Sequence, residues 1–195
     1  YKKRAVDLAD KLMALQETEY IEGQTEVRGF FYRDAKKDAI FCSLMAHGGM
    51  DGAEGAVSVL ADLCEALPTH AECPRWKESL RLYLEDYLLP LSNKNAFGIV
   101  PAYLSRNDLA GGQTGAKMQR SVGGLHYQYL CDNRGANKVL ARKAILLARG
   151  ARILENPELR DAAWRQVAWI LGNNPLNAST VYGVGHGQPR VYKPQ

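Results

Sequence analysis

Apolar residues recur at intervals of three and four positions along most of this chain, the spacing that places side chains on one face of an α-helix. The clearest run has apolar or small side chains at Val57, Leu60, Ala61 and Cys64. The same periodicity predicts six helices, over residues 5–17, 53–66, 74–89, 116–131, 136–153 and 158–171. The last of these carries Trp164 and Trp169 at helical spacing, and we expect both in the core.

Proline and glycine residues mark the ends of these helices. Pro74 stands where the first residue of a helix is expected, Pro90 is expected to end that helix, and Gly172 ends the last one. Short connections predict two helical hairpins, 53–66/74–89 and 136–153/158–171. The alternation of β-branched residues typical of strands is absent, so the sequence gives no support to a Rossmann or sandwich fold. The sequence therefore predicts an all-α fold, with long loops over residues 20–51 and 90–115.

Composition agrees with one globular domain. The chain has 195 residues, of which 46% are hydrophobic and 24% charged, and no change in composition marks an internal boundary within 1–195. The formal net charge is +4, but the basic residues are spread along the chain, so nucleic acid is not an expected partner. No apolar run approaches the roughly 20 residues that a membrane span needs.

The four cysteines, Cys42, Cys64, Cys73 and Cys131, are too few for a disulfide framework. Cys64 and Cys73 flank the turn of the first predicted hairpin. They could pair in an exported protein, or they could be buried free thiols on helix faces. With His70 they offer only three nearby ligands, at a spacing that fits no standard zinc pattern, so no metal site is predicted.

The end of the last predicted helix and the loop after it form the most distinctive motif. Residues 169–187 read Trp-Ile-Leu-Gly-Asn-Asn-Pro-Leu-Asn-Ala-Ser-Thr-Val-Tyr-Gly-Val-Gly-His-Gly. This order of helix end, Asn-Pro turn and glycine-rich loop resembles the C-terminal signature of glycoside hydrolase family 9 catalytic domains. Residues 123–133 read Gly-Gly-Leu-His-Tyr-Gln-Tyr-Leu-Cys-Asp-Asn and are similar to a tyrosine-bearing inner helix of that family. The specific similarity covers residues 120–187.

The resemblance implies an (α/α)6 barrel of helical hairpins whose long loops form a substrate groove at one end. Residues 1–195 would then form about half of such a barrel, paired with the missing half of their own domain or with another copy. The family implies a carbohydrate substrate and a periplasmic or extracellular location. It allows calcium, although no Asp-rich ligand loop stands out, and no other cofactor is expected.

Two departures from the family pattern concern the chemistry. Residues 192–195 read Tyr-Lys-Pro-Gln where the family has Pro-His-His-Arg, whose His and Arg contact sugar. The family's aspartate pair and general-acid glutamate fall outside this chain, so the catalytic residues are unknown. Four acidic residues lie near the first long loop with no spacing that selects one of them: Asp34, Asp38, Asp51 and Glu54.

Tyr182 and His186 are candidates for sugar binding, because glycines beside them let the backbone approach a ligand. Arg190 offers a cation for an acidic sugar or a pair of hydroxyls, or else faces solvent. Phe97 and Tyr103 lie in the second long loop, where exposed rings would let a pyranose pack.

Two further candidates, Tyr127 and His47, each have a structural interpretation beside the functional one. Tyr127 matches the tyrosine of the family's inner helix and would contact substrate or lie in the barrel core. His47 lies on a glycine-flanked loop, where it would face the groove or cap a helix.

The sequence therefore favours a glycoside hydrolase that acts on β-linked polysaccharide or oligosaccharide. The loss of Pro-His-His-Arg argues against a plain cellulase and suits a different sugar, or exo-action on an amino sugar or uronic acid. Two alternatives stay open. One is a non-catalytic helical array that binds glycan or protein, and the other is a toroid lyase or epimerase that uses Tyr or His.

Overall fold

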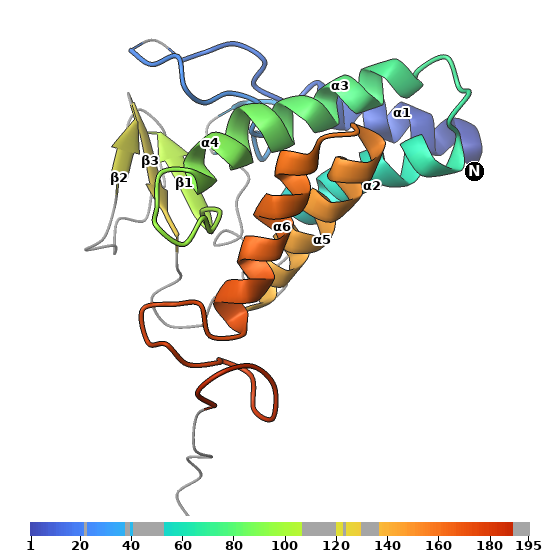
Figure 1. The fold of residues 1–195 in the computed structure, drawn as a ribbon. Coiled ribbons are helices and arrows are strands. Elements are labelled where there is room, and N and C mark those ends of the chain that lie inside the picture. The colour runs from blue at the N-terminus through green and yellow to red at the C-terminus, as the bar shows by residue number, and fades with distance from the viewer. Residues whose placement is uncertain are drawn as a thin grey trace, which may run out of the picture.

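The computed structural model describes residues 1–21, 23–37, 40, 53–106, 120–122, 124–129 and 137–188. Long helices lie on one side, a small sheet lies beside them, and the chain after the last helix extends away from both (Figure 1). The helices are α1 (Lys2–Met13), α2 (Ala53–Ala66), α3 (Cys73–Tyr83), the π-helix η1 (Leu84–Leu88), α4 (Leu89–Ser92), α5 (Asn137–Ile153) and α6 (Pro157–Ile170). The strands are β1 (Tyr103–Arg106), β2 (Arg120–Val122) and β3 (Leu125–Gln128).

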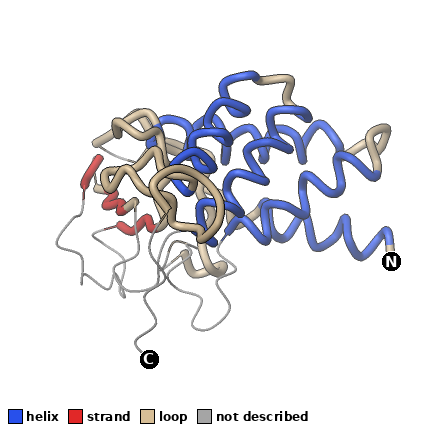
Figure 2. The backbone as a smooth tube through the Cα atoms, turned by 60° about the horizontal axis from the view of Figure 1, so that its bottom comes forward, coloured by secondary structure: helices blue, strands red, loops and turns tan. Residues whose placement is uncertain are grey.

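Two helical hairpins form the body of the structure, which confirms that prediction. α2 packs against α3, α5 packs against α6, and α5 also packs on α2, so the hairpins are joined. Helices gather at one end of the described chain and strands and loops at the other (Figure 2). The bounds of α2 match the prediction, and those of α5 and α6 agree within one residue. α1 begins and ends a few residues earlier than predicted.

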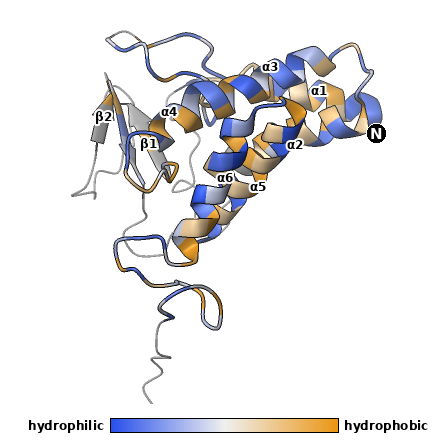
Figure 3. Ribbon diagram, viewed as in Figure 1, coloured by the Kyte–Doolittle hydropathy of each residue, from blue (hydrophilic) through white to orange (hydrophobic). Residues whose placement is uncertain are grey.

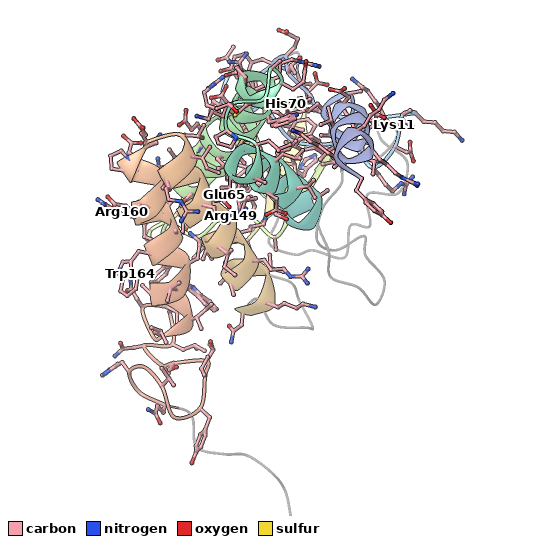
Figure 4. All side chains as sticks on the ribbon, turned by 90° about the vertical axis from the view of Figure 1, so that its right-hand side faces the viewer. Lys11, Glu65, His70, Arg149, Arg160 and Trp164 are labelled. Atoms are coloured by element: carbon pink, nitrogen blue, oxygen red, sulfur yellow. The ribbon has the colours of Figure 1, made fainter. Side chains whose placement is uncertain are left out.

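Apolar side chains of the hairpins pack together and form the main core. Figure 3 shows hydrophobic residues along each of these helices, beside hydrophilic ones. Trp76, Leu60 and Leu147 are fully buried in the core. Trp169 is buried as expected, but the prediction for Trp164 is wrong, because 65% of its surface is exposed. Trp164 lies with Arg160 on the outer side of α6 (Figure 4).

The predicted helix end at Pro90 is wrong, because the helix continues through η1 and α4 to Ser92. Proline lacks an N–H and its ring collides with the carbonyl four residues earlier in a regular α-helix. Here the wider π-turn precedes Pro90, and the amide of Leu89 donates to the carbonyl of Leu84. The carbonyl of Asp86 instead accepts from the amide of Arg28 at 3.0 Å, so a neighbouring segment supplies the donor that Pro90 lacks.

The predicted helix over residues 116–131 is also wrong. This region contributes β2 and β3 to an antiparallel sheet with the order β1-β3-β2. Tyr127 of β3 therefore lies on a strand opposite Leu104, and not on an inner helix. Leu125 and Tyr127 are buried while His126 between them is half-buried, which is the period-two pattern of a strand.

The segment after α1 wraps around α3 and fills the core with aromatic side chains. Phe30, Phe31 and Tyr32 are buried, and Gly29 lies so close to the backbone of Leu82 that no Cβ would fit. Among the residues that the structure describes, every helix is too short or too polar to serve as a membrane span.

Candidate functional site

The candidate site is built on α6, which begins and ends at defined residues. The side chain of Asn156 accepts a hydrogen bond from the amide of Glu158 at 2.9 Å and caps the helix, and Pro157 occupies its first position. The helix ends at Ile170, and Gly172 follows with a φ of 126°. The glycine-rich loop, residues 171–188, continues directly from this end.

The buried side chain of Asn174 holds the first half of the glycine-rich loop. Its Nδ2 donates to the carbonyl oxygens of Trp169 at 2.8 Å and Ala178 at 2.7 Å. Its Oδ1 accepts from the amide of Leu176 at 3.0 Å. One amide group therefore ties the loop to the last turn of α6, as expected for a residue that turns the chain.

Main-chain hydrogen bonds fold the second half of the loop back onto α6. The amide of His186 donates to the carbonyl of Leu171 at 2.9 Å, and the amide of Ser179 donates to the carbonyl of His186 at 2.5 Å. A Cβ on Gly185, which has a φ of 87°, would overlap the carbonyl of Leu171. Only glycine fits this close approach.

The loop is also attached to the start of α5. Thr180 Oγ1 donates to Asn137 Oδ1 at 2.9 Å, and the amide of Thr180 donates to the carbonyl of Ile170 at 2.9 Å. The loop thus has fixed contacts with both helices of the second hairpin.

Tyr182 and His186 are exposed on this fixed loop. Tyr182 has 70% of its surface exposed, and His186 is exposed although its backbone is hydrogen-bonded on both sides. A phenol ring offers a flat apolar face with a polar end, and an imidazole offers a donor and an acceptor. These are the groups that can stack on a sugar ring and hydrogen-bond its hydroxyls.

A second ordered loop, residues 93–102, packs against the same end of α6. Gln166 is fully buried and donates from Nε2 to the carbonyl of Gly98 at 2.9 Å, while its Oε1 accepts from the amide of Val100 at 2.9 Å. Asn95 pins the loop from inside by accepting from the amide of Ile99 at 3.1 Å. This loop carries Phe97.

Phe97 and Tyr127 are less exposed than the candidates on the glycine-rich loop. Phe97 is half-buried and packs with Trp169 in a small apolar cluster. Tyr127 is 3% exposed, and its ring packs edge-on against Tyr129, which touches the same cluster. In this structure Tyr127 therefore belongs to the core.

Of the remaining candidates, the structure gives the backbone position of one, and the others lie outside the described residues. Tyr103 begins β1, with Gln128 as its partner across the sheet. His47 and Arg190 lie outside the described residues, as do Asp38 and Asp51. Phe97, Tyr182 and His186 thus lie on the two loops that contact the C-terminal end of α6.

Sequence reasoning missed the buried polar residues that shape this region. Gln166 is one, and Lys143 of α5 is another: it is 1% exposed and donates to the carbonyl of Pro101. A polar residue in a helical pattern is ordinarily assigned to a solvated face. The only sequence signal was the position of Gln166 and Lys143 between residues of the apolar stripe.

Two carboxyl groups are held in the charged form by arginines. A hydrogen bond from Arg149 lowers the pKa of Glu65, and one from Arg81 lowers the pKa of Glu78. A general acid needs the opposite shift, so these residues fit ion pairing and not proton donation. Of the acidic group near the first loop, Asp34 pairs with Arg33 at 3.2 Å, and Glu54 lies in the first turn of α2.

A surface pocket of about 350 Å³ lies at the opposite end of α6, at its turn with α5. Its lining combines small and charged side chains, including Ala148, Arg152, Glu155 and Arg160, and no aromatic ring. It therefore lacks the flat apolar face that a sugar packs on. Within the described part of the chain, no three His, Cys, Asp or Glu side chains converge as a metal site would require.

One comparison with known proteins bears on this arrangement. The family model described as Glycosyl hydrolase family 9 matches residues 16–193. The match includes both hairpins, the sheet and the whole glycine-rich loop.

Proposed function

This chain belongs to glycosyl hydrolase family 9, and we propose that its glycine-rich loop binds the β-linked poly- or oligosaccharide that the enzyme hydrolyses. Membership makes the chain part of a glycoside hydrolase, and its helical hairpins are those of an (α/α)6 fold. Within that fold we assign residues 1–195 to one domain.

The observation that carries the proposal is the contrast between the fixed backbone and the exposed side chains of the loop. Asn174 and the amide of His186 hold the loop to α6, while the Tyr182 ring stays exposed. A site whose backbone is already ordered loses little conformational entropy when a ligand binds. The Tyr182 ring would stack on a pyranose, and the His186 imidazole would hydrogen-bond a hydroxyl.

We assign a binding role, and no proton transfer, to the described residues of this region. Hydrolysis with inversion needs a carboxylic acid and a carboxylate on opposite sides of the glycosidic bond, about 6.5–9.5 Å apart. The loop offers aromatic, imidazole and amide groups instead. Arg190, two residues past the described end of the loop, would add a cation suited to an acidic sugar. A location outside the cytoplasm is part of the same proposal.

The test is titration of the protein with soluble β-linked oligosaccharides, followed by calorimetry, together with an assay for released reducing ends. Tyr182→Ala is expected to weaken binding roughly tenfold by removing the stacking ring. Leu176→Ala, at an equally exposed apolar site on the same loop, is the matched control and is expected to leave binding unchanged.

The other outcomes separate the alternatives. Binding without release of reducing ends by the natural protein would favour a non-catalytic glycan-binding module. Unsaturated products would favour a lyase. Equal binding by the Tyr182→Ala and Leu176→Ala variants would place the sugar elsewhere on the molecule.

A further inference from the structure

Two buried cysteines lie inside the first hairpin, at the ends of α2 and α3 that the turn connects. Cys64 lies in the last turn of α2, and Cys73 is the first residue of α3. Their exposed fractions are 4% and 3%, and both belong to the main apolar core. Both thiols are free, and Cys73 is close enough to contribute to the raised pKa of Cys64.

The turn between these helices fixes their separation. The amide of Leu67 donates to the carbonyl of Leu63 at 2.9 Å, and the amide of Cys73 donates to the carbonyl of His70 at 2.9 Å. His70 stacks on Trp76 with their ring centroids 5.1 Å apart, which holds the turn against α3. Because Cys64 and Cys73 lie at the adjoining ends of two packed helices and in one apolar cluster, rotation of their side chains can bring the sulfurs to bonding distance.

From this geometry we propose that Cys64 and Cys73 form a native disulfide when the protein folds in the presence of a disulfide oxidant. One thiolate attacks the oxidant, forms a mixed disulfide and releases one thiol. The second thiolate then attacks the protein sulfur of that mixed disulfide, forms the Cys64–Cys73 bond and releases the second thiol. The two cysteines lose two electrons and two protons, and the oxidant's disulfide becomes two thiols.

The surroundings of Cys64 determine when this reaction proceeds. Burial, with a further contribution from Cys73, raises the pKa of Cys64 to about 12. The attacking species is the thiolate, so the packed hairpin reacts slowly. The bond therefore forms during folding or when the hairpin opens. Reduced, folded protein is expected to resist both alkylation and oxidation at these two positions.

The positions of the glutamates allow the Cys64–Cys73 disulfide to be identified after cleavage of the chain at glutamate. Cleavage at Glu54, Glu65, Glu72 and Glu78 places Cys64 in peptide 55–65 and Cys73 in peptide 73–78. The other two cysteines fall elsewhere, Cys42 in peptide 27–54 and Cys131 in peptide 86–155. Each possible pairing thus gives a different linked mass.

The experiment is refolding of the reduced protein with oxidised glutathione, followed by this digest and mass spectrometry. The expected product is peptide 55–65 linked to peptide 73–78, about 2 Da lighter than the sum of the two thiol peptides. Linkage to Cys42 or Cys131, glutathione retained on Cys64 or Cys73, or both thiols left free would overturn the proposal.

A melting experiment gives an independent readout. The oxidised protein is expected to melt roughly 5 °C above the reduced protein, because the bond restricts the unfolded chain. Cys42→Ser should keep this difference, and Cys64→Ala/Cys73→Ala should abolish it. The peptide map uses unaltered protein, so the test holds even where a variant fails to fold. Neither readout involves sugar binding, so the result is independent of the proposed function.

Discussion

Arg149 of α5 donates a hydrogen bond to Glu65 of α2, with Nη2 and Oε2 2.8 Å apart, and so joins the two hairpins by charge as well as by packing (Figure 4). The same guanidinium donates to Asp62 at 2.6 Å, and Arg152 donates to Glu65 at 2.5 Å. Glu65 therefore sits between two arginines of the neighbouring hairpin.

This pairing predicts a loss of stability at acid pH. The pKa of Glu65 is lower in the folded protein than in the unfolded chain. Its contribution is therefore fully present above the pKa of an unfolded glutamate, and it is lost as the pH falls through the lowered folded value. Glu65→Gln is expected to cost about 0.5 kcal/mol at pH 7, as for a partly exposed ion pair, and less at pH 3.

Urea unfolding at several pH values measures this difference. Glu155→Gln is a suitable control, because Glu155 is exposed at the other hairpin turn and forms no ion pair with the described residues. A Glu65→Gln variant whose cost is unchanged between pH 7 and pH 3 would contradict the electrostatic explanation.

Replacing Asn174 should loosen the glycine-rich loop. Asn174→Ala removes two donated hydrogen bonds and leaves the carbonyls of Trp169 and Ala178 without that partner. We expect a loss of about 1–3 kcal/mol in the free energy of unfolding, measured in urea. Asn173→Ala, at an exposed neighbouring position, should change it by less than about 0.5 kcal/mol. Equal effects would mean that the buried amide does not hold the loop.

Two glycines of the same loop allow a test of close packing apart from backbone conformation. Gly183 and Gly185 both have positive φ, 80° and 87°. A Cβ on Gly183 meets nothing within 4 Å, whereas one on Gly185 overlaps Leu171. Gly183→Ala should cost roughly 1 kcal/mol from backbone strain alone, and Gly185→Ala clearly more. Thermal unfolding of the two variants gives the comparison.

The three tryptophans differ enough in exposure to be distinguished by fluorescence. Trp164 is 65% exposed, Trp169 9% and Trp76 fully buried. Acrylamide should therefore quench mainly Trp164, and Trp164→Phe should remove most of the quenchable emission. Trp169→Phe should leave that fraction in place. Quenching that persists in the Trp164→Phe variant would contradict this assignment, and weak quenching of the unaltered protein would show that this face of α6 is covered in solution.

Trp164 and Trp169 should also differ in their contribution to the free energy of unfolding. Trp169→Ala opens a cavity in the small apolar cluster and is expected to cost about 3–5 kcal/mol. Trp164→Ala should stay within about 0.5 kcal/mol of the original protein. Urea unfolding of both variants measures the contrast.

Local periodicity was sufficient for the helical hairpins but not for the sheet. The apolar residues of α2 recur at helical spacing and Pro68 follows the end of the helix, so its bounds follow from nearby residues. β3 is only four residues long, and its partner β1 lies about twenty residues earlier in the chain. Its strand conformation depends on that distant pairing, which no short window of sequence records. Pro90 failed as a helix end for the same reason, because Arg28 satisfies the carbonyl of Asp86 from far away in sequence.

The candidate site was predictable in part. The glycines around Tyr182 and His186 predicted a loop whose backbone packs closely, and both residues lie on such a loop in the structure. Gln166 was not predictable, because a glutamine on a helix is indistinguishable in sequence from a solvated one until its loop partners are known. Its role depends on Gly98 and Val100, more than sixty residues earlier in the chain.

The residues that fix the shape of the glycine-rich loop, such as Asn174, differ from the residues whose side chains are exposed on it. The shape of the loop depends on one buried amide, on glycines and on main-chain hydrogen bonds, while Tyr182 and Val184 project outward without anchoring it. Exposed residues on such a frame can change identity at little cost to folding. Selection for a new ligand can therefore act on these positions alone, and a laboratory search for altered specificity has a natural starting library there.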